Sequence, residues 1–208
     1  MVRKTIYYIG RRKIYDLIRS LLFEDVISIK FLETLDDKYI ENLLVDNVFS
    51  RYVPSRYVID SETDIVYIIN KLVKIISELL ECNDVVIGID PGDEVSGVAI
   101  LHCNYPTIHT KLTTLKIVKL IQLLSNIDNI NLRVCIGVKS SRKFKDIKNI
   151  ETILSLGKDV PIYIVDEEYT KYRRSIYNRR RRGCKISSDE LDAVVYALSI
   201  DDGIRVTL

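Results

Sequence analysis

The sequence predicts an α/β protein: a mixed sheet flanked by helices, with a small N-terminal α/β domain before it. Short β-branched apolar runs alternate with longer segments in which apolar residues recur at helical spacing. After residue 80, the predicted order is three strands, helix, strand, helix, strand and helix, which is typical of a mixed sheet with helices on its faces. The 208 residues, 47% of them hydrophobic, suffice for one large or two small cores.

The sequence pattern of residues 1–80 predicts the small mixed α/β domain, and no motif in it indicates a catalytic or binding function. Ser61 or Thr63 can cap the last helix of this domain, with acidic residues in its first turn. The expected elements are strands over residues 4–9 and 26–32, and helices over residues 14–22, 39–49 and 61–80.

Residues 81–208 predict the larger domain. Its last helix begins near Ser188, and Ser187 with Glu190 fits a capping box, in which the hydroxyl and the carboxylate each satisfy a backbone N–H. The other expected elements are strands over residues 85–89, 97–102, 132–138 and 162–165, a hairpin that ends near residue 114, and helices over residues 115–124 and 147–156.

One carboxylate, that of Asp90, follows a strand that is predicted to be buried on both faces. Pro91 and Gly92 end this strand, because proline has no N–H for the sheet and glycine permits the turn. An ionisable group at the end of a buried strand is costly unless a metal, a cation or a hydrogen-bonding turn stabilises it. Asp90 is therefore the first candidate for a functional residue.

Further acidic residues lie at the ends of later elements. Glu167 follows the strand over residues 162–165, and Asp189 and Asp192 share one face of the last helix. Taken separately, these acids are also typical of a solvated strand end or of an ordinary helix start. If the start of the helix meets the ends of the strands, however, they converge with Asp90.

Three motifs in this order resemble the ribonuclease H-like nucleases of the RuvC and YqgF type, over about residues 84–200. They are IGIDPG with GVAI behind it, VDEEYT after a proline-led strand, and DELDAVVYAL on the last helix. RuvC-type resolvases carry a DxxDA pattern on this helix, which residues 189–193 match. YqgF-type proteins carry a DER-T signature, which residues 166–170 approach.

The two types differ in the source of the second acid. RuvC enzymes take it from the end of the fourth strand, where this chain has Gly137, Val138 and Lys139. The resemblance to the YqgF type therefore implies Glu167 as the second acid. Glu168 replaces the arginine of that family and is the alternative by one residue.

The resemblance implies a nuclease that depends on Mg²⁺ or Mn²⁺ and has Asp90, Glu167, Asp189 and Asp192 as catalytic residues. Mg²⁺ prefers oxygen ligands and keeps several waters, so a few carboxylates suffice to hold one or two ions against a phosphate. On this hypothesis Asp90 bridges the metals, Glu167 and Asp192 hold one each, and Asp189 assists.

A basic segment precedes the last helix. Residues 171–185 carry eight basic residues and no acidic one. Arginine pairs with phosphate in a bidentate manner, so this segment is the expected nucleic-acid contact; a solvated linker or a surface for a partner protein is the alternative. The residues concerned are Lys171, Arg173, Arg174, Arg179, Arg180, Arg181, Arg182 and Lys185.

Several functions remain open. The first is a RuvC-like Holliday junction resolvase of DNA recombination and repair, with a homodimer as the expected partnership; the others are a YqgF-like nuclease of structured RNA and a non-catalytic nucleic-acid-binding module. The chain is too short for the two lobes of an actin-like ATPase. We expect a cytoplasmic protein without membrane contact and with reduced thiols, whose cysteines and His102 belong to the core.

Overall fold

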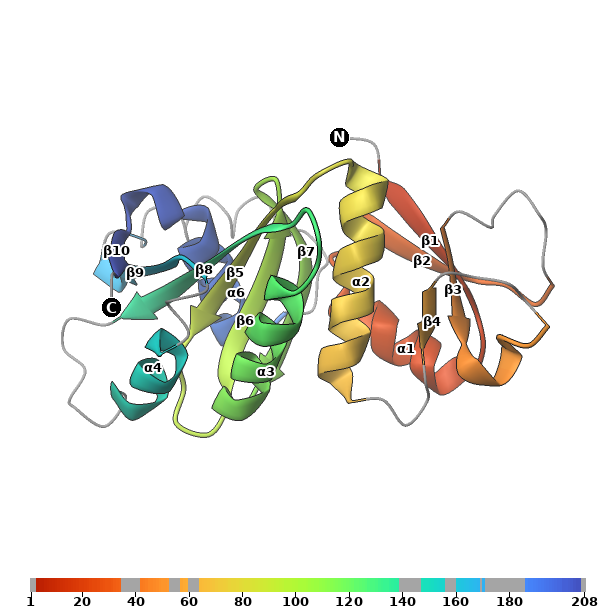
Figure 1. Ribbon diagram of the computed structural model, residues 1–208, viewed down its shortest axis with the longest axis horizontal. Coiled ribbons are helices and arrows are strands. Elements are labelled where there is room, and N and C mark those ends of the chain that lie inside the picture. Colours follow the sequence, from red (N-terminus) through yellow and green to blue (C-terminus); the bar gives the residue numbers. More distant parts are fainter. Residues whose placement is uncertain are drawn as a thin grey trace. The chain divides into compact units, whose positions relative to one another are not determined.

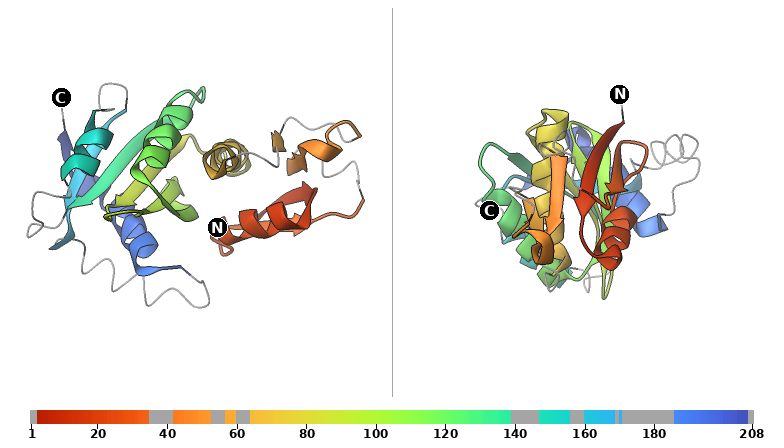
Figure 2. Two further views of the ribbon diagram at one scale, coloured as in Figure 1. Left: turned by 90° about the horizontal axis from the view of Figure 1, so that it is seen from below. Right: turned by 90° about the vertical axis from the view of Figure 1, so that its right-hand side faces the viewer.

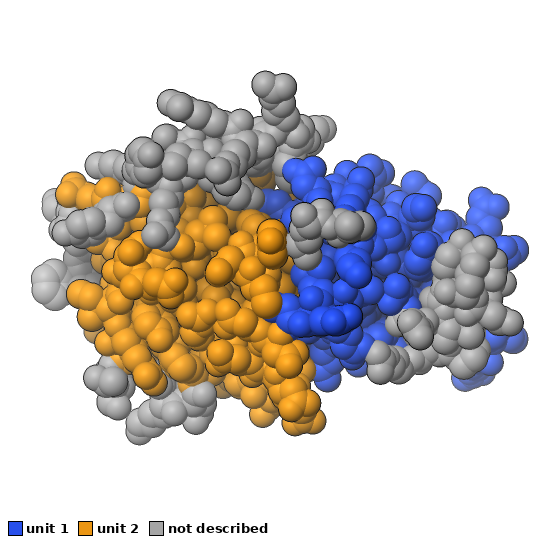
Figure 3. Space-filling view, turned by 90° about the horizontal axis from the view of Figure 1, so that it is seen from above, with its two compact units in different colours: residues 1–82 blue, residues 83–208 orange. Residues whose placement is uncertain are grey.

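The computed structural model describes residues 3–34, 42–52, 57–59, 64–138, 147–155, 160–168, 170 and 186–206. The chain divides into two compact units, Met1–Cys82 and Asn83–Leu208 (Figure 3). Each unit contains one sheet of its own (Figure 1).

The N-terminal unit is built on a four-stranded sheet with the order β2-β1-β3-β4, in which all three pairings are parallel. Helix α1 packs on β2, and helix α2 contacts β4 and β1. Apolar side chains on both faces of the sheet are buried, as in the consecutive residues Leu43, Leu44 and Val45. The elements are β1 (Lys4–Ile9), α1 (Arg12–Leu21), β2 (Ile27–Phe31), β3 (Leu43–Asp46), η2 (Asn47–Phe49), β4 (Tyr57–Ile59) and α2 (Ile65–Leu80).

Two expectations for this unit are wrong. The helix expected over residues 39–49 is, in its described part, strand β3 followed by the short 3₁₀ helix η2. A short apolar run is compatible with either structure, and pairing with β1 and β4 decides for the strand. Helix α2 is capped by Asp64, which accepts a hydrogen bond from the Val66 N–H at 3.3 Å. The first turn of α2 contains no acid, and Ser61 and Thr63 lie outside the described residues.

The C-terminal unit contains a six-stranded sheet with the order β10-β9-β8-β5-β6-β7. Strands β5, β6 and β7 are antiparallel, β8 and β9 continue from β5 in parallel, and β10 returns antiparallel to β9. The expected mixed sheet is therefore confirmed, and β10 is an edge strand that the sequence did not predict. The elements are β5 (Asp84–Asp90), β6 (Ser96–His102), β7 (Tyr105–Leu112), α3 (Thr114–Ser125), β8 (Asn131–Val138), α4 (Ile147–Leu154), β9 (Ile162–Asp166), α6 (Ser188–Leu198), η4 (Ile200–Asp202) and β10 (Ile204–Val206).

Helix α6 covers one face of this sheet, and α3 and α4 cover the other (Figure 2). Glycines allow α6 to lie very close to the strands. A Cβ atom at Gly88 would overlap the carbonyl group of Ala193, and one at Gly97 would overlap the backbone of Asp189. The first turn of α6 is thereby placed directly against β6. Of the helices that the structure describes, none is long and apolar enough to cross a membrane.

The core histidine is confirmed, but two expectations about the cysteines are wrong: Cys103 is exposed and not part of the core, and not all thiols are reduced. His102 is fully buried, and its Nδ1 lies 2.7 Å from the hydroxyl of Thr107. Cys135 is a free, buried thiol whose pKa is raised by burial to about 12. Cys82 and Cys103 are disulfide-bonded, whereas reduced thiols were expected. Spacing along the chain does not show which cysteines have disulfide geometry, because the fold decides it.

Candidate active site at the end of the central strand

Asp90 is the last residue of β5, in the middle of the sheet, and its exposed fraction is only 9%. The turn after it is tightly closed. The Gly92 N–H donates a hydrogen bond to the Ser96 hydroxyl at 3.3 Å, and a Cβ atom at Gly92 would overlap the carbonyl oxygen of Val95. The predicted strand end is therefore confirmed, and it leaves a largely buried carboxyl group where β5 stops.

The start of α6 lies beside Asp90 for a reason that the pairing of the strands makes clear. Asp90 of β5 is the register partner of Gly97 of β6. The Asp90 side chain and the position that a Gly97 side chain would take therefore lie on the same face of the sheet. Because Gly97 has no side chain, the backbone of Asp189 fills the space beside it. The start of the last helix therefore lies beside the end of the central strand, which was the condition for its acids to converge with Asp90.

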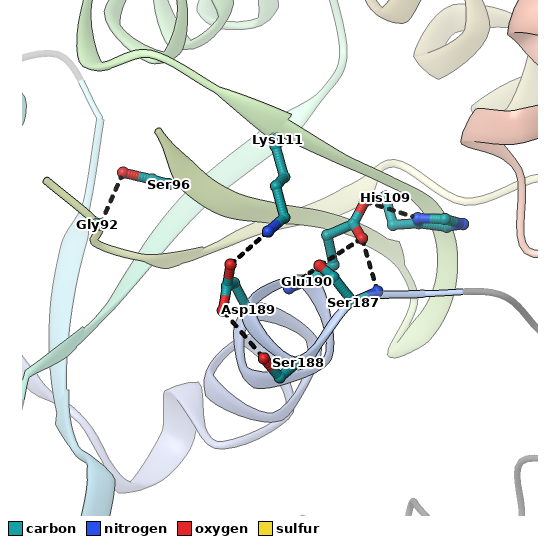
Figure 4. A network of polar contacts seen from close by, with 8 residues as sticks. All are labelled: Gly92, Ser96, His109, Lys111, Ser187, Ser188, Asp189 and Glu190. Carbon is teal, nitrogen blue, oxygen red and sulfur yellow. Dashed lines mark hydrogen bonds and ion pairs between the residues drawn. The ribbon is translucent and has the colours of Figure 1, made fainter. Parts of the chain in front are cut away.

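The next strand adds a cation to the same row. Gly97 also pairs with Lys111 of β7, so that Asp90, Gly97 and Lys111 form one row across three strands. The Lys111 ammonium lies 2.5 Å from Oδ2 of Asp189 (Figure 4). This hydrogen bond lowers the pKa of Asp189 and raises that of Lys111, which the negative charges of Glu190 and Asp90 raise further.

A second polar pair anchors α6 to β7. The predicted capping box is confirmed: the Glu190 carboxylate accepts from the Ser187 N–H at 2.9 Å, and the Ser187 hydroxyl accepts from the Glu190 N–H at 3.4 Å. The other oxygen of Glu190 lies 3.0 Å from Nδ1 of His109, and both side chains are largely buried. Burial raises the pKa of Glu190, but hydrogen bonds from His109 and Ser187 outweigh it and lower the pKa to about 2.

Sequence reasoning missed His109 and Lys111. They are two residues apart on β7 and therefore face the same side of the sheet, toward α6 (Figure 4). Period-2 spacing of two basic side chains in an expected strand was the available signal. It could not show that their partners are residues 189 and 190, about 80 positions later in the chain.

The remaining predicted acids lie on α6 and directly after β9. Asp192 is partly buried on α6, three residues after Asp189. Glu167 directly follows β9, at the same edge of the sheet as Asp90. Strand β8 separates β9 from β5, so about 10 Å divides the two strands. Among the residues that the structure describes, no three acidic, histidine or cysteine side chains are grouped to hold a metal.

The alternative second acid, Glu168, is exposed, and its N–H donates to the Asp166 carboxylate at 2.9 Å. The predicted nucleic-acid contact cannot be placed in the fold. All of its residues lie outside the described part of the chain: Lys171, Arg173, Arg174, Arg179, Arg180, Arg181, Arg182 and Lys185.

The acids at the start of α6 suit a hard divalent ion. Asp90, Asp189 and Asp192 offer only carboxylate oxygens, which Mg²⁺ prefers, and this ion is usually bound by one or two carboxylates together with waters and substrate phosphates. The Lys111 ammonium beside Asp189 is a stand-in cation, since it shows that this position stabilises positive charge. The donor chemistry of these residues therefore suits Mg²⁺ or Mn²⁺ held by one or two carboxylates, while no three acids of the described residues are grouped for a metal.

Two solved structures are similar to part of this chain, at low sequence identity. RuvC of Thermus thermophilus in complex with a Holliday junction substrate has 14% sequence identity to this chain and a TM-score of 0.45, and the match covers 55% of this chain and 90% of that one. A second structure of Thermus thermophilus RuvC has 13% identity and a TM-score of 0.45, with coverage of 59% and 99%. No protein-family model and no curated protein matches the sequence. At such values we take no residue role from these structures.

Proposed function

We propose that this protein is a metal-dependent endonuclease that hydrolyses phosphodiester bonds in structured nucleic acid, with a Holliday junction as its first candidate substrate. One observation carries the proposal. The largely buried Asp90 ends the central strand, and its register partner Gly97 admits the first turn of α6, so that the backbone of Asp189 lies beside the end of this strand. Two elements thereby bring acidic residues to the same end of the sheet.

The residues have separate tasks in this proposal. Asp90 and Asp189 hold the divalent ion, with Asp192 further along the same helix face. Glu167 is the second acid that the resemblance implies, on the neighbouring part of the same edge. Mg²⁺, when bound, would supply Lewis-acid stabilisation of the charge on the phosphate. The basic residues of segment 171–185 would bind and orient the phosphate backbone through charge-assisted hydrogen bonds.

Two other functions have observations in their favour. A YqgF-like nuclease of structured RNA is favoured because β8 ends at Val138 without a carboxylate, while Glu167 follows β9. A non-catalytic binding module is favoured because no three metal-binding side chains are grouped within the described residues. The three functions differ in substrate and in metal dependence, so one assay separates them.

The test is cleavage of a four-way DNA junction, duplex DNA, single-stranded DNA and structured RNA, with Mg²⁺ or Mn²⁺ and with EDTA. Asp90→Asn removes the central carboxylate charge at nearly constant shape. Asp128→Asn, at an exposed residue after α3, is the matched control. We expect the wild type and Asp128→Asn to cut one substrate in a metal-dependent manner, and Asp90→Asn to lose at least a hundredfold in rate.

The pattern of products chooses between the functions. Symmetric paired nicks in the junction by a stable dimer support the resolvase, because a two-fold enzyme presents two equal sites to a two-fold substrate. Cleavage of RNA alone supports the YqgF-like nuclease. Equal binding of one substrate by the wild type and Asp90→Asn, without cleavage by either, supports the binding module and contradicts the nuclease.

A further inference from the structure

We propose that Lys111 is a positioning residue of this site: in the metal-free protein its ammonium group holds the place beside Asp189 that a divalent ion takes, and metal binding displaces it. The inference rests on the proposed function, since it concerns the same acids. It assigns a task to a residue that belongs to neither the capping box nor the acid motif of α6.

The position of Lys111 follows from the row of residues across the strands. Asp90, Gly97 and Lys111 are aligned on β5, β6 and β7, and all three face α6. Gly97, in the middle, has no side chain, and the backbone of Asp189 fills the space that a side chain would take. The acid of β5 and the cation of β7 therefore flank the first turn of α6 from opposite sides.

Both oxygens of Asp189 are already engaged. Oδ2 accepts a hydrogen bond from Lys111 at 2.5 Å, and Oδ1 accepts one from the Ser188 hydroxyl at 3.1 Å (Figure 4). An ion that takes either oxygen as a ligand must displace a donor or share the oxygen with it. The lysine is the donor whose positive charge competes with the ion, so the two cations exclude each other at this carboxylate.

The two polar pairs between β7 and α6 differ in how easily they can open. His109 and Glu190 have exposed fractions of only 6% and 13%, whereas Lys111 and Asp189 are 41% and 43% exposed. The buried pair can hold the helix on the sheet while the exposed pair exchanges its cation without opening the core. An exposed ion pair contributes little net free energy, so a dication can replace it.

The lysine also has a reason to be there when no metal is bound. Asp189, Glu190 and Asp192 lie close together in the first turns of α6, whose start is beside Asp90, and like charges at short range repel each other. The Lys111 ammonium group, which contacts Asp189, offsets part of this negative charge until a divalent ion replaces it.

The test compares metal binding in the absence of nucleic acid. Mg²⁺ and Mn²⁺ are titrated at constant ionic strength into the full-length wild type, Lys111→Met, Lys111→Arg and Lys30→Met, and binding is followed by calorimetry and by the rise in Tm. Lys111→Met keeps a long side chain and removes the charge. Lys30 is an exposed strand residue of the other unit and controls for the loss of one positive charge.

We expect Lys111→Met to bind the metal roughly fivefold more tightly than the wild type, because the competing charge is gone. Lys111→Arg and Lys30→Met should keep the wild-type affinity within about twofold. In the wild type, the NMR signal of the Lys111 ε-methylene group should shift during the titration, which a merely structural lysine would not show.

Failure of the proposal for Lys111 can be distinguished from failure of the proposed metal-dependent function. If the wild type and Lys111→Met bind metal with equal affinity, and Asp90→Asn binds it weakly, the metal site stands and the proposal for Lys111 is overturned. If neither protein binds metal at millimolar concentration, the metal-dependent function fails and the proposal fails with it. If the wild type shows no binding but Lys111→Met does, the competition is supported in its strongest form.

Discussion

Each unit of the molecule has an aspartate that is paired with a cation near the end of a sheet strand, and the two pairs differ in burial and in the number of partners. Asp46, the last residue of β3, is fully buried. Its carboxylate accepts hydrogen bonds from Nε and Nη2 of Arg11 at 2.8 and 3.1 Å, and from the Val48 N–H at 3.2 Å. Asp189 in the other unit is 43% exposed, and among the described residues its cationic partner is Lys111.

The comparison shows how burial and the number of partners divide structural acids from available ones. Burial alone raises the pKa of Asp46, but hydrogen bonds from Arg11 and Val48 outweigh it and leave the pKa below its ordinary value. Removing such a group leaves donors without a partner inside the protein. Asp189 is also stabilised as an anion, yet water can replace its partner. Asp46 therefore has a structural role in the N-terminal unit, whereas Asp189 is a candidate metal ligand in the C-terminal unit.

The largest effect is expected at Asp46. Asp46→Asn should lower the free energy of unfolding of the N-terminal unit by about 3 kcal/mol. The substitution removes the buried negative charge that pairs with Arg11 and caps the η2 backbone. Native-state hydrogen exchange of β1 and β3 amides measures this unit by itself. Asp16→Asn, at an exposed residue of α1, should cost under about 0.5 kcal/mol. Equal effects of the two variants would contradict the distinction between buried structural acids and exposed acids.

Glu190 supplies a test by pH in the C-terminal unit. Its folded-state pKa of about 2 lies below the ordinary value of 4.5, so its contribution to stability is fully present above pH 4.5 and is lost as the pH falls toward 2. The loss should amount to about 2 to 3 kcal/mol. Urea unfolding between pH 7 and pH 2, followed by circular dichroism, measures it.

The matched variants for this pH test are Glu190→Gln and Glu151→Gln. Glu190→Gln should be less stable than the wild type at neutral pH and should flatten this part of the profile. Glu151 is an exposed residue of α4, and its replacement should leave the profile unchanged. A Glu190→Gln profile that keeps the full acid loss would show that other groups cause it.

An intermediate effect is expected at Gly97, which joins the two halves of the candidate site. Gly97→Ala introduces a Cβ atom that would overlap the Asp189 backbone, so α6 must shift, at a cost of about 2 kcal/mol. Hydrogen exchange of β5 and β6 amides measures the destabilisation. The same variant should weaken metal binding, because the shift separates Asp189 from Asp90. Unchanged stability and unchanged metal affinity would contradict the close packing of α6.

The smallest effect on stability is expected at Asp189. Asp189→Asn should change the free energy of unfolding by less than about 0.5 kcal/mol, since its pair with Lys111 is exposed. The same variant should abolish metal binding and cleavage if the proposed function holds. A loss of stability as large as that of Asp46→Asn would place Asp189 among the structural acids and would remove the contrast between the two edges.

Local features of the fold were predictable because each depends on residues close in the sequence. The strand over 85–89 and its end at Pro91 follow from hydrophobic pattern and turn chemistry, and the capping box at Ser187 follows from two residues three apart. The helix that was expected over residues 39–49 shows the limit. Its apolar run is buried by pairing with strands on both sides, and that pairing outweighs a helical pattern.

The candidate site divides in the same way. Asp90 and the acids of α6 were predictable, since a carboxylate at the end of a buried strand or in a first helical turn is visible in the sequence. His109 and Lys111 were not predictable as members of the site. They join it through contacts that span about 80 residues and depend on the register of β7 against β6.

The sequence by itself therefore determined most of the elements, the turn after Asp90 and the cap of α6, because these depend on interactions between neighbouring residues. Only the tertiary structure decided the order of the strands, the approach of α6 to Gly97, and the choice of Lys111 as the cation beside Asp189. These features depend on burial and on strand register, which many distant residues set together. A carboxylate in the sequence shows its charge, but only the fold shows whether that carboxylate is buried beside an arginine, as in Asp46, or exposed beside a lysine, as in Asp189.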